Sequence, residues 1–267
     1  MHGGEMHHSS RRLWMVSGTG EGPLLARQLL AMGWQLTVSV VTPAAALAYA
    51  ASENLTIQVG ALAGEAGIGA ELAAAWASGQ PYAVVVDASH PFASQVSRDL
   101  AAVCRRHRQR LLRLLRPALG GAATVLDQLD DLAALPLAGE PMLLAIGARQ
   151  LATAMGRSRG ARHHARLLPS ASALQQAMAA GLEPARVACL RPGAELEVER
   201  ALVRRWGITT VLARQSGGGT EQLWHDICAR EGARLLLLRR PDEPAAAAGL
   251  ELDALLATLA AQFPAHR

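Results

Sequence analysis

Three short segments, each directly after a predicted strand, carry the residues best suited to bind a ligand. The first runs from Ser17 to Pro23, with glycines at 18, 20 and 22 between a predicted strand and a predicted helix. Glycines allow close backbone approach, and the start of the helix offers unpaired N–H groups and a positive dipole to a phosphate. An ordinary glycine-rich turn is the alternative, because the third glycine lies one residue early for a G-x-G-x-x-G motif.

The second segment, residues 87–93, reads DASHPFA and follows the apolar run YAVVVD. At the carboxyl end of a buried strand, His90 is well placed to bind an anionic group or to move a proton. Asp87 or Ser89 can instead organise the turn and cap the next helix. From these residues alone the structural interpretation is slightly favoured.

The third segment, residues 214–221, reads RQSGGGTE and again joins a predicted strand to a predicted helix. Arg214 places a cation beside a glycine-rich loop that is suited to an anion. A flexible loop with Thr220 as the helix cap is the alternative. One such loop in each half of the chain favours a ligand cleft between the halves.

The basic residues exclude several classes of enzyme. All 26 are Arg and none is Lys, with a net charge of +4. A Schiff-base or pyridoxal-phosphate enzyme, a P-loop and a Tyr-x-x-x-Lys dehydrogenase all need a lysine. A composition bias is the favoured cause of this absence, and guanidinium groups suit carboxylates and phosphates.

Six arginines gather around one predicted helix end and the strand after it: Arg105, Arg106, Arg108, Arg110, Arg113 and Arg116. Aromatic residues make up only 3% of the chain, and no nucleic-acid-binding motif is present. A solvated helix end, or a carboxylate-rich small substrate near Arg113 or Arg116, is therefore favoured over nucleic acid.

Cysteines, histidines and hydropathy limit the remaining classes. Cys104, Cys189 and Cys228 are isolated, which predicts no metal site and favours a reducing, cytoplasmic compartment. No apolar run approaches the roughly 18 residues of a membrane span. The first ten residues are polar and contain three histidines, and they are predicted to be a disordered tail.

The elements that position these segments alternate strand with helix, which predicts an α/β fold with parallel sheets. Strands are predicted at 13–17, 35–41, 56–59, 82–87, 110–115, 142–146, 162–168, 186–190, 208–213 and 234–239. Helices are predicted at 23–32, 71–78, 93–107, 126–135, 148–155, 171–181, 194–206, 221–231 and 250–263. Proline and glycine interrupt the alternation between residues 117 and 141. We therefore predict an N-terminal domain over 11–138 and a C-terminal domain over 139–267.

Taken in order, these segments resemble the precorrin-6A reductase family. The resemblance runs from about Leu13 to Pro241, and DASHPFA is its most specific part. The other matching segments are GTGEG at 18–22, LLRLLRP at 111–117, AIG at 145–147, ARLLP at 165–169, RQSGGG at 214–219 and RRP at 239–241.

The resemblance implies two Rossmann-like domains facing a cleft and an enzyme of corrin-ring synthesis. Hydride would pass from a reduced nicotinamide to a macrocyclic double bond, giving precorrin-6B or its cobalt form. The tetrapyrrole carries many carboxylates, which suits arginines, and a monomer without nucleic-acid or membrane partners is expected. NADPH is favoured over NADH, because Val41-Thr42-Pro43 stands where an acid would bind a ribose hydroxyl.

By the same resemblance, individual residues receive roles. His90 is the candidate for handling a proton. The residues expected to hold the cofactor are Gly18, Thr19, Gly20, Glu21, Thr42 and Ser89. Those expected to hold the substrate are Asp87, Arg113, Arg116, Arg214, Ser216, Gly217 and Gly218.

Two departures from the family pattern keep alternatives open. The family usually has Lys at position 214, and a Q-G-P-F-like stretch where this chain reads Arg191-Pro192-Gly193-Ala194. Arginine keeps the charge but not the point geometry of a lysine. A homologue that binds tetrapyrrole or dinucleotide with altered catalysis, or another nicotinamide enzyme on the same plan, remains the alternative.

Overall fold

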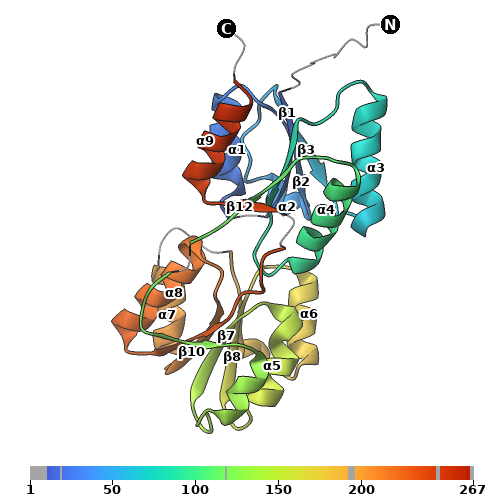
Figure 1. The fold of residues 1–267 in the computed structure, drawn as a ribbon. Helices are drawn as coiled ribbons and strands as arrows, with labels where there is room; N and C mark the ends of the chain where they lie inside the picture. The colour runs from blue at the N-terminus through green and yellow to red at the C-terminus, as the bar shows by residue number, and fades with distance from the viewer. Residues whose placement is uncertain (1–10, 19, 118, 192–195, 245–246, 265–267) are drawn as a thin grey trace, which may run out of the picture. The chain divides into compact units, whose positions relative to one another are not determined.

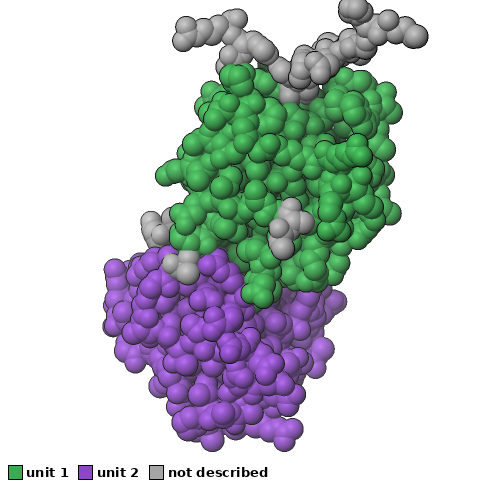
Figure 2. All heavy atoms as spheres, in the orientation of Figure 1, with its two compact units in different colours: residues 1–117, 241–267 green, residues 118–240 purple. Residues whose placement is uncertain are grey.

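The structure is a computed structural model that describes residues 11–18, 20–117, 119–191, 196–244 and 247–264. The chain forms two compact units (Figure 2). Unit 1 contains residues 1–117 and 241–267, and unit 2 contains residues 118–240. The tail predicted over residues 1–10 lies outside the described residues.

Unit 1 is built on a six-stranded parallel sheet of order β12-β5-β4-β1-β2-β3. Its strands are β1 (Arg12–Ser17), β2 (Gln35–Val40), β3 (Leu55–Val59), β4 (Val84–Ala88), β5 (Leu111–Leu114) and β12 (Ala248–Leu250). Its helices are α1 (Gly22–Ala31), α2 (Pro43–Ala46), α3 (Gly64–Ala77), α4 (Ser94–Arg106) and α9 (Leu252–Gln262).

Helices cover both faces of this sheet (Figure 1). Leu25 of α1 and Leu259 of α9 belong to the core on one face. Ile68 of α3 and Leu100 of α4 belong to the core on the other face. Every residue of β4 is buried, as expected for a central strand that is covered on both sides.

Unit 2 repeats the plan with a sheet of order β6-β11-β10-β7-β8-β9. Its strands are β6 (Ala123–Leu126), β7 (Pro141–Ala145), β8 (Arg162–Leu167), β9 (Val187–Cys189), β10 (Thr210–Arg214) and β11 (Arg234–Leu238). Its α-helices are α5 (Leu151–Arg157), α6 (Ala171–Ala179), α7 (Glu197–Arg205) and α8 (Gly218–Glu231). Short 3₁₀ helices are η1 (Leu129–Ala134), η2 (Ala148–Gln150) and η3 (Pro184–Arg186).

Each sheet has one point at which the strand order reverses. In unit 1 the chain runs from β1 out to β3 and then returns to β4 on the other side of β1. In unit 2 it runs from β7 out to β9 and returns to β10 on the other side of β7. Ligands of open parallel sheets bind at such points, beyond the carboxyl ends of the strands.

The predicted α/β class with two parallel sheets is confirmed, but the chain divides at other places than predicted. Unit 2 begins at residue 118 because β6, in a segment expected to hold only a helix, pairs with β11. Residues after 240 return to unit 1, where β12 pairs with β5 and α9 packs beside α1. These pairings join segments far apart in sequence, so no local pattern announces them.

Within the described residues, none of the helices has the length and apolar content needed to cross a bilayer.

Candidate functional site

The switch point of unit 1 brings two of the predicted segments together. Strands β1 and β4 pair in parallel, with Ser17 opposite Ala88. The glycine-rich turn after β1 and the turn after β4 therefore start from neighbouring positions on the same sheet edge. Thr19 lies outside the described residues.

Two hydroxyl groups donate hydrogen bonds to the backbone of the glycine-rich turn. Ser17 Oγ donates to the carbonyl oxygen of Gly18 at 3.2 Å, and Tyr49 Oη donates to the same oxygen at 3.3 Å. A Cβ atom on Gly22 would lie 1.9 Å from Ser17 Oγ and 2.5 Å from Tyr49 Oη. Position 22 therefore admits no side chain, and the start of α1 can approach the strand closely.

Tyr49 is a site residue that the sequence did not reveal, because it follows α2 and matches no motif. Its side chain is buried, and burial raises the pKa of the Tyr49 phenol, an effect that the hydrogen bond to Ser17 partly offsets. The phenol therefore keeps its proton and remains a donor under the turn.

A cation lies against the same turn. Arg116, which follows β5, pairs with Glu21 at 2.7 Å between Nη2 and Oε2. The same Nη2 atom would lie 3.2 Å from a Cβ on Gly20. The structure thus brings Arg116, predicted for substrate, together with Gly20 and Glu21, predicted for cofactor. A guanidinium beside a glycine-rich turn is suited to a phosphate or a carboxylate.

Asp87 and Arg113, both predicted to bind substrate, lie inside unit 1. Their side chains are 1% and 2% exposed, and Arg113 Nη1 lies 2.7 Å from Asp87 Oδ2. Arg113 Nε also pairs with Glu243. Burial lowers the pKa of Arg113, but Asp87 and Glu243 outweigh burial, so that the pKa is raised overall. Arg113 is therefore permanently charged, and two carboxylates face its single positive charge.

The turn that carries His90 is held by these buried groups. Asp87 Oδ1 accepts the backbone N–H of Ser89 at 2.9 Å, and Arg113 Nη1 donates to Ser89 Oγ at 3.3 Å. His90 Nδ1 accepts the backbone N–H of Phe92 at 3.1 Å. In the neutral ring, the His90 proton must then lie on Nε2, which makes that atom a donor.

Thr42, predicted for cofactor, lies beyond the carboxyl end of β2, the strand next to β1. It is exposed, and its side chain accepts the backbone N–H of Ala45 at 3.2 Å, which caps α2. Exposed apolar side chains lie on the same stretch and on β3: Val41 is 66% exposed, Leu47 81% and Val59 49%. Such side chains can pack against a flat, partly apolar part of a ligand.

The switch point of unit 2 has its own cation, Arg214, at the end of β10. Arg214 Nη2 donates to Gln150 Oε1 at 3.1 Å and would lie 3.2 Å from a Cβ on Gly147, at the end of β7. Burial, and then the neighbouring Arg149, lower the pKa of Arg214. The AIG and RQSGGG segments, far apart in sequence, therefore meet at one edge of the sheet.

The loop after Arg214 is less suited to an anion than its glycines suggest. Helix α8 begins at Gly218, three residues before its predicted start. The backbone N–H of Gly217 donates to Glu221 Oε2 at 2.6 Å, and Glu221 is fully buried. Ser216 is buried too, and its Oγ donates to the carbonyl of Gly217 at 3.3 Å. An acid of the first turn therefore occupies the N–H of Gly217 and places a negative charge at this end of the helix, so Arg214 supplies the positive charge.

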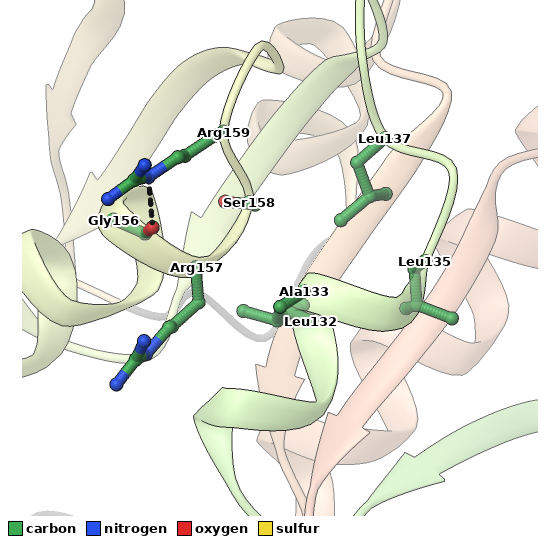
Figure 3. Close-up of a pocket in the computed structure, with 8 residues that line it drawn as sticks. All are labelled: Leu132, Ala133, Leu135, Leu137, Gly156, Arg157, Ser158 and Arg159. Atoms are coloured by element: carbon green, nitrogen blue, oxygen red, sulfur yellow. Dashed lines mark hydrogen bonds between the residues drawn. The ribbon is translucent and has the colours of Figure 1, made fainter.

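A cavity of about 400 Å³ opens elsewhere in unit 2 (Figure 3). Its lining comes from η1, the segment after η1 and the end of α5: Leu132, Ala133, Leu135, Leu137, Gly156, Arg157, Ser158 and Arg159. Strands β7 and β8 begin just after these residues, so the cavity lies at the edge of the sheet opposite to Arg214. No predicted site residue lines it.

The stretch 191–194, where the sequence departs from the family pattern, lies mostly outside the described residues, which include only Arg191 of it. Among the residues that the structure does describe, no three His, Cys, Asp or Glu side chains come together as metal ligands.

Comparisons with known proteins agree with one another over nearly the whole chain. The family described as precorrin-6x reductase CbiJ/CobK matches residues 12–260. A cobalt-precorrin-6A reductase of Synechocystis is 32% identical over 88% of this chain and 91% of its own length. A precorrin-6A reductase of Rhodobacter capsulatus is 28% identical over 93% of this chain and 96% of its own. A solved structure of a CobK precorrin-6A reductase superposes with a TM-score of 0.76 at 24% identity, covering 95% and 97% of the two chains.

Proposed function

The chain belongs to the precorrin-6x reductase family, and from this premise we propose that it reduces precorrin-6A, or the cobalt form, to the 6B form. It is a nicotinamide-dependent oxidoreductase of cobalamin biosynthesis. The observation that carries this conclusion is the family match over residues 12–260, which spans both units and all three predicted segments.

The turn after β1 fits the phosphates of a dinucleotide. Among the described residues other than its chain neighbours, none has an atom within 4 Å of a Cβ on Gly18, and position 22 is kept free of a side chain by Ser17 and Tyr49. Glu21, the N-cap residue of α1, makes no side-chain capping hydrogen bond, and the N–H groups at such a helix start can bind a phosphate. We assign Gly18, Thr19, Gly20, Glu21 and Ser89 to the cofactor. When bound, the reduced nicotinamide supplies the hydride.

NADPH is the proposed form of the cofactor. The ribose of the adenosine half is expected at the end of β2, where an NADH enzyme usually has an acid. This chain has Val41-Thr42-Pro43 there, and Thr42 is exposed. A neutral hydroxyl tolerates a 2′-phosphate, whereas a carboxylate would repel it.

Arginines are proposed to hold the carboxylates of the tetrapyrrole. Arg214, with Ser216, Gly217 and Gly218 beside it, is the candidate in unit 2, and Arg116 is the candidate in unit 1. Each guanidinium lies against a glycine, and the N–H groups of a guanidinium suit the paired oxygens of a carboxylate. His90, with the proton of its neutral ring on Nε2, is the candidate for orienting the substrate or handling the proton added beside the hydride.

The chain is proposed to act as a monomer on this small molecule, without a nucleic-acid or membrane partner. The cytoplasm is the proposed compartment, because all three cysteines are free thiols, as a reducing environment would keep them.

Turnover with the substrate tests this function directly. Purified protein is incubated anaerobically with precorrin-6A and NADPH or NADH, and cofactor absorbance and tetrapyrrole mass are followed. We expect cofactor oxidation coupled to a gain of two hydrogen atoms, faster with NADPH. A reaction with cobalt-precorrin-6A alone would identify the cobalt form as substrate. If the protein bound tetrapyrrole and cofactor but turned over neither precorrin-6A nor the cobalt form, it would be a binding protein and not a reductase.

A further inference from the structure

Arg113 joins three separate segments of unit 1. Its guanidinium pairs with Asp87 at the end of β4, donates to Ser89 in the following turn, and pairs with Glu243, 130 residues further on. The Arg113 side chain is 2% exposed, so no ligand can reach it without displacing one of these partners. Its function must therefore be exerted through its neighbours.

Glu243 belongs to the segment that returns to unit 1 after residue 240. No motif in the sequence marks it, and it adjoins no predicted site residue along the chain. Its side chain is 32% exposed, so it closes the buried cluster on the side that solvent reaches. Its neighbour Asp242 carries the same charge and is exposed.

The cluster fixes the start of the turn that carries His90. Ser89 is held twice, because its N–H donates to Asp87 and its Oγ accepts from Arg113. Ser89 Oγ also lies 3.2 Å from Ser97 Oγ, which ties the turn to α4. The backbone of Ser89 determines where the His90 ring begins, and the Phe92 N–H then fixes the orientation of that ring.

Removing Glu243 would change the balance of charge in this cluster. Arg113 Nε would lose its acceptor, and a buried cation with an unsatisfied donor draws its remaining partners toward itself or admits water. Both adjustments act on the Asp87 carboxylate and the Ser89 hydroxyl, because the backbone of Asp87 is held in β4 between β1 and β5. A shift of about 1 Å in a catalytic group is enough to reduce turnover strongly.

We propose that Glu243 is a positioning residue of the reductase: through Arg113 it holds the Ser89–His90 turn in the geometry that turnover requires. This proposal rests on the proposed function, since it takes His90 to face the reacting groups. It predicts that the site of unit 1 is incomplete without the segment that returns from unit 2.

Glu243→Ala, with Asp242→Ala as the matched control, tests the proposal. We expect Glu243→Ala to lower kcat by roughly tenfold. The Kd for NADP⁺ should change less than kcat, because Ser89 is the one residue assigned to the cofactor that the described contacts of this cluster hold. Glu243→Gln keeps an oxygen acceptor for Arg113 Nε and should recover part of kcat. Asp242→Ala should behave as wild type.

A second readout does not depend on activity. In protein labelled with ¹⁵N-histidine, the His90 ring signals, assigned by comparison with His90→Gln, should shift in Glu243→Ala and stay in Asp242→Ala. Unchanged His90 signals together with wild-type kcat would overturn the proposal. If wild type itself shows no turnover, the proposed function fails, and the ring signals still decide this inference. Should Glu243→Ala not fold, Glu243→Gln decides it: a smaller shift of the His90 signals with a partly lowered kcat supports the proposal, and unchanged signals with wild-type kcat overturn it.

Discussion

Arg214 Nη2 lies 3.2 Å from the position that a Cβ atom on Gly147 would occupy, so the guanidinium packs directly on a bare backbone. Gly147 follows β7 and Arg214 ends β10, the two strands that flank the switch point of unit 2. Unit 1 repeats this relationship with other strands, since Arg116 Nη2 lies at the same distance from a Cβ on Gly20.

Gly147→Ala should weaken the tetrapyrrole site of unit 2. Gly147 has φ +81° and ψ 158°, a conformation that essentially only glycine adopts, so alanine adds backbone strain of about 1–3 kcal/mol and also pushes the Arg214 guanidinium away. We expect a lower Tm and a higher KM for tetrapyrrole. Gly181→Ala is the control, because Gly181 has φ +90° and, apart from its chain neighbours, no described residue lies within 4 Å of a Cβ there. It should share the stability loss but not the change in KM; equal KM values for the two variants would contradict the account.

Gly22→Ala should abolish cofactor binding. The new Cβ atom would lie 1.9 Å from Ser17 Oγ and 2.5 Å from Tyr49 Oη, so the turn must move. Overpacking of this kind costs about 1–3 kcal/mol of stability. Calorimetric titration with NADP⁺ should detect no binding at concentrations that saturate wild type. Gly69→Ala in α3, where the nearest atom is 3.8 Å from the new Cβ, should bind NADP⁺ normally.

Arg214→Ala should raise KM for the tetrapyrrole while the Kd for NADP⁺ stays the same. A hydrogen bond to a charged group contributes about 1.5–3 kcal/mol, which corresponds to roughly a tenfold to hundredfold change in KM. Arg214→Lys should fall between wild type and alanine, because it keeps the charge but not the planar donor pair. Steady-state kinetics with Arg149→Ala, an exposed neighbouring cation, provide the control. A weaker affinity for NADP⁺ in Arg214→Ala would instead assign this arginine to the cofactor.

His90→Ala should lower kcat by about 100-fold if the ring handles the proton, and should leave the affinity for NADP⁺ nearly unchanged. The matched variant is His107→Ala, which changes an exposed histidine at the end of α4. Single-turnover measurements separate this chemical step from product release. Unchanged turnover in His90→Ala would exclude a proton-handling role for this residue.

The three cysteines should differ in reactivity. Burial, with the charge of Asp87 adding to it for Cys104, raises the pKa values of Cys104 and Cys228 to about 12. At pH 8 both groups are therefore thiols and lie out of reach of reagents, whereas Cys189 is partly exposed. A thiol-specific chromogenic reagent should modify one cysteine quickly and the other two only after denaturation. Rapid modification of all three in the folded protein would contradict the core described above.

The sequence predicted the fold class, and it predicted candidate residues at the carboxyl ends of strands in both sheets. Strands, helices and glycine-rich turns have local signatures, which makes such predictions possible. The apolar run before Asp87 and the glycines at 18–22 are such signatures. Strand β6 and the return of β12 and α9 to unit 1 were missed, because short edge strands are recognised only through their partners. Tyr49 and Glu243 were missed for the same reason: each acts on a turn that is distant in sequence.

Burial is the property that the sequence conveyed least well. Arg113 and Arg116 lie three residues apart and were given one role, yet Arg113 is internal and Arg116 lies on the glycine-rich turn. Side chains alternate between the two faces of an extended segment, so residues three apart point in opposite directions. Because both residues are arginines, their type alone could not reveal this difference.

The most direct test of the reductase follows the hydride itself. NADPH carrying deuterium at C4 of the nicotinamide is prepared as each of its two epimers and is given to the protein with precorrin-6A or its cobalt form. We predict a product with two added hydrogen atoms, of which one is deuterium from one epimer and neither is deuterium from the other. Product that contains no deuterium from either epimer, or the absence of product with both substrates, would contradict hydride transfer by this protein.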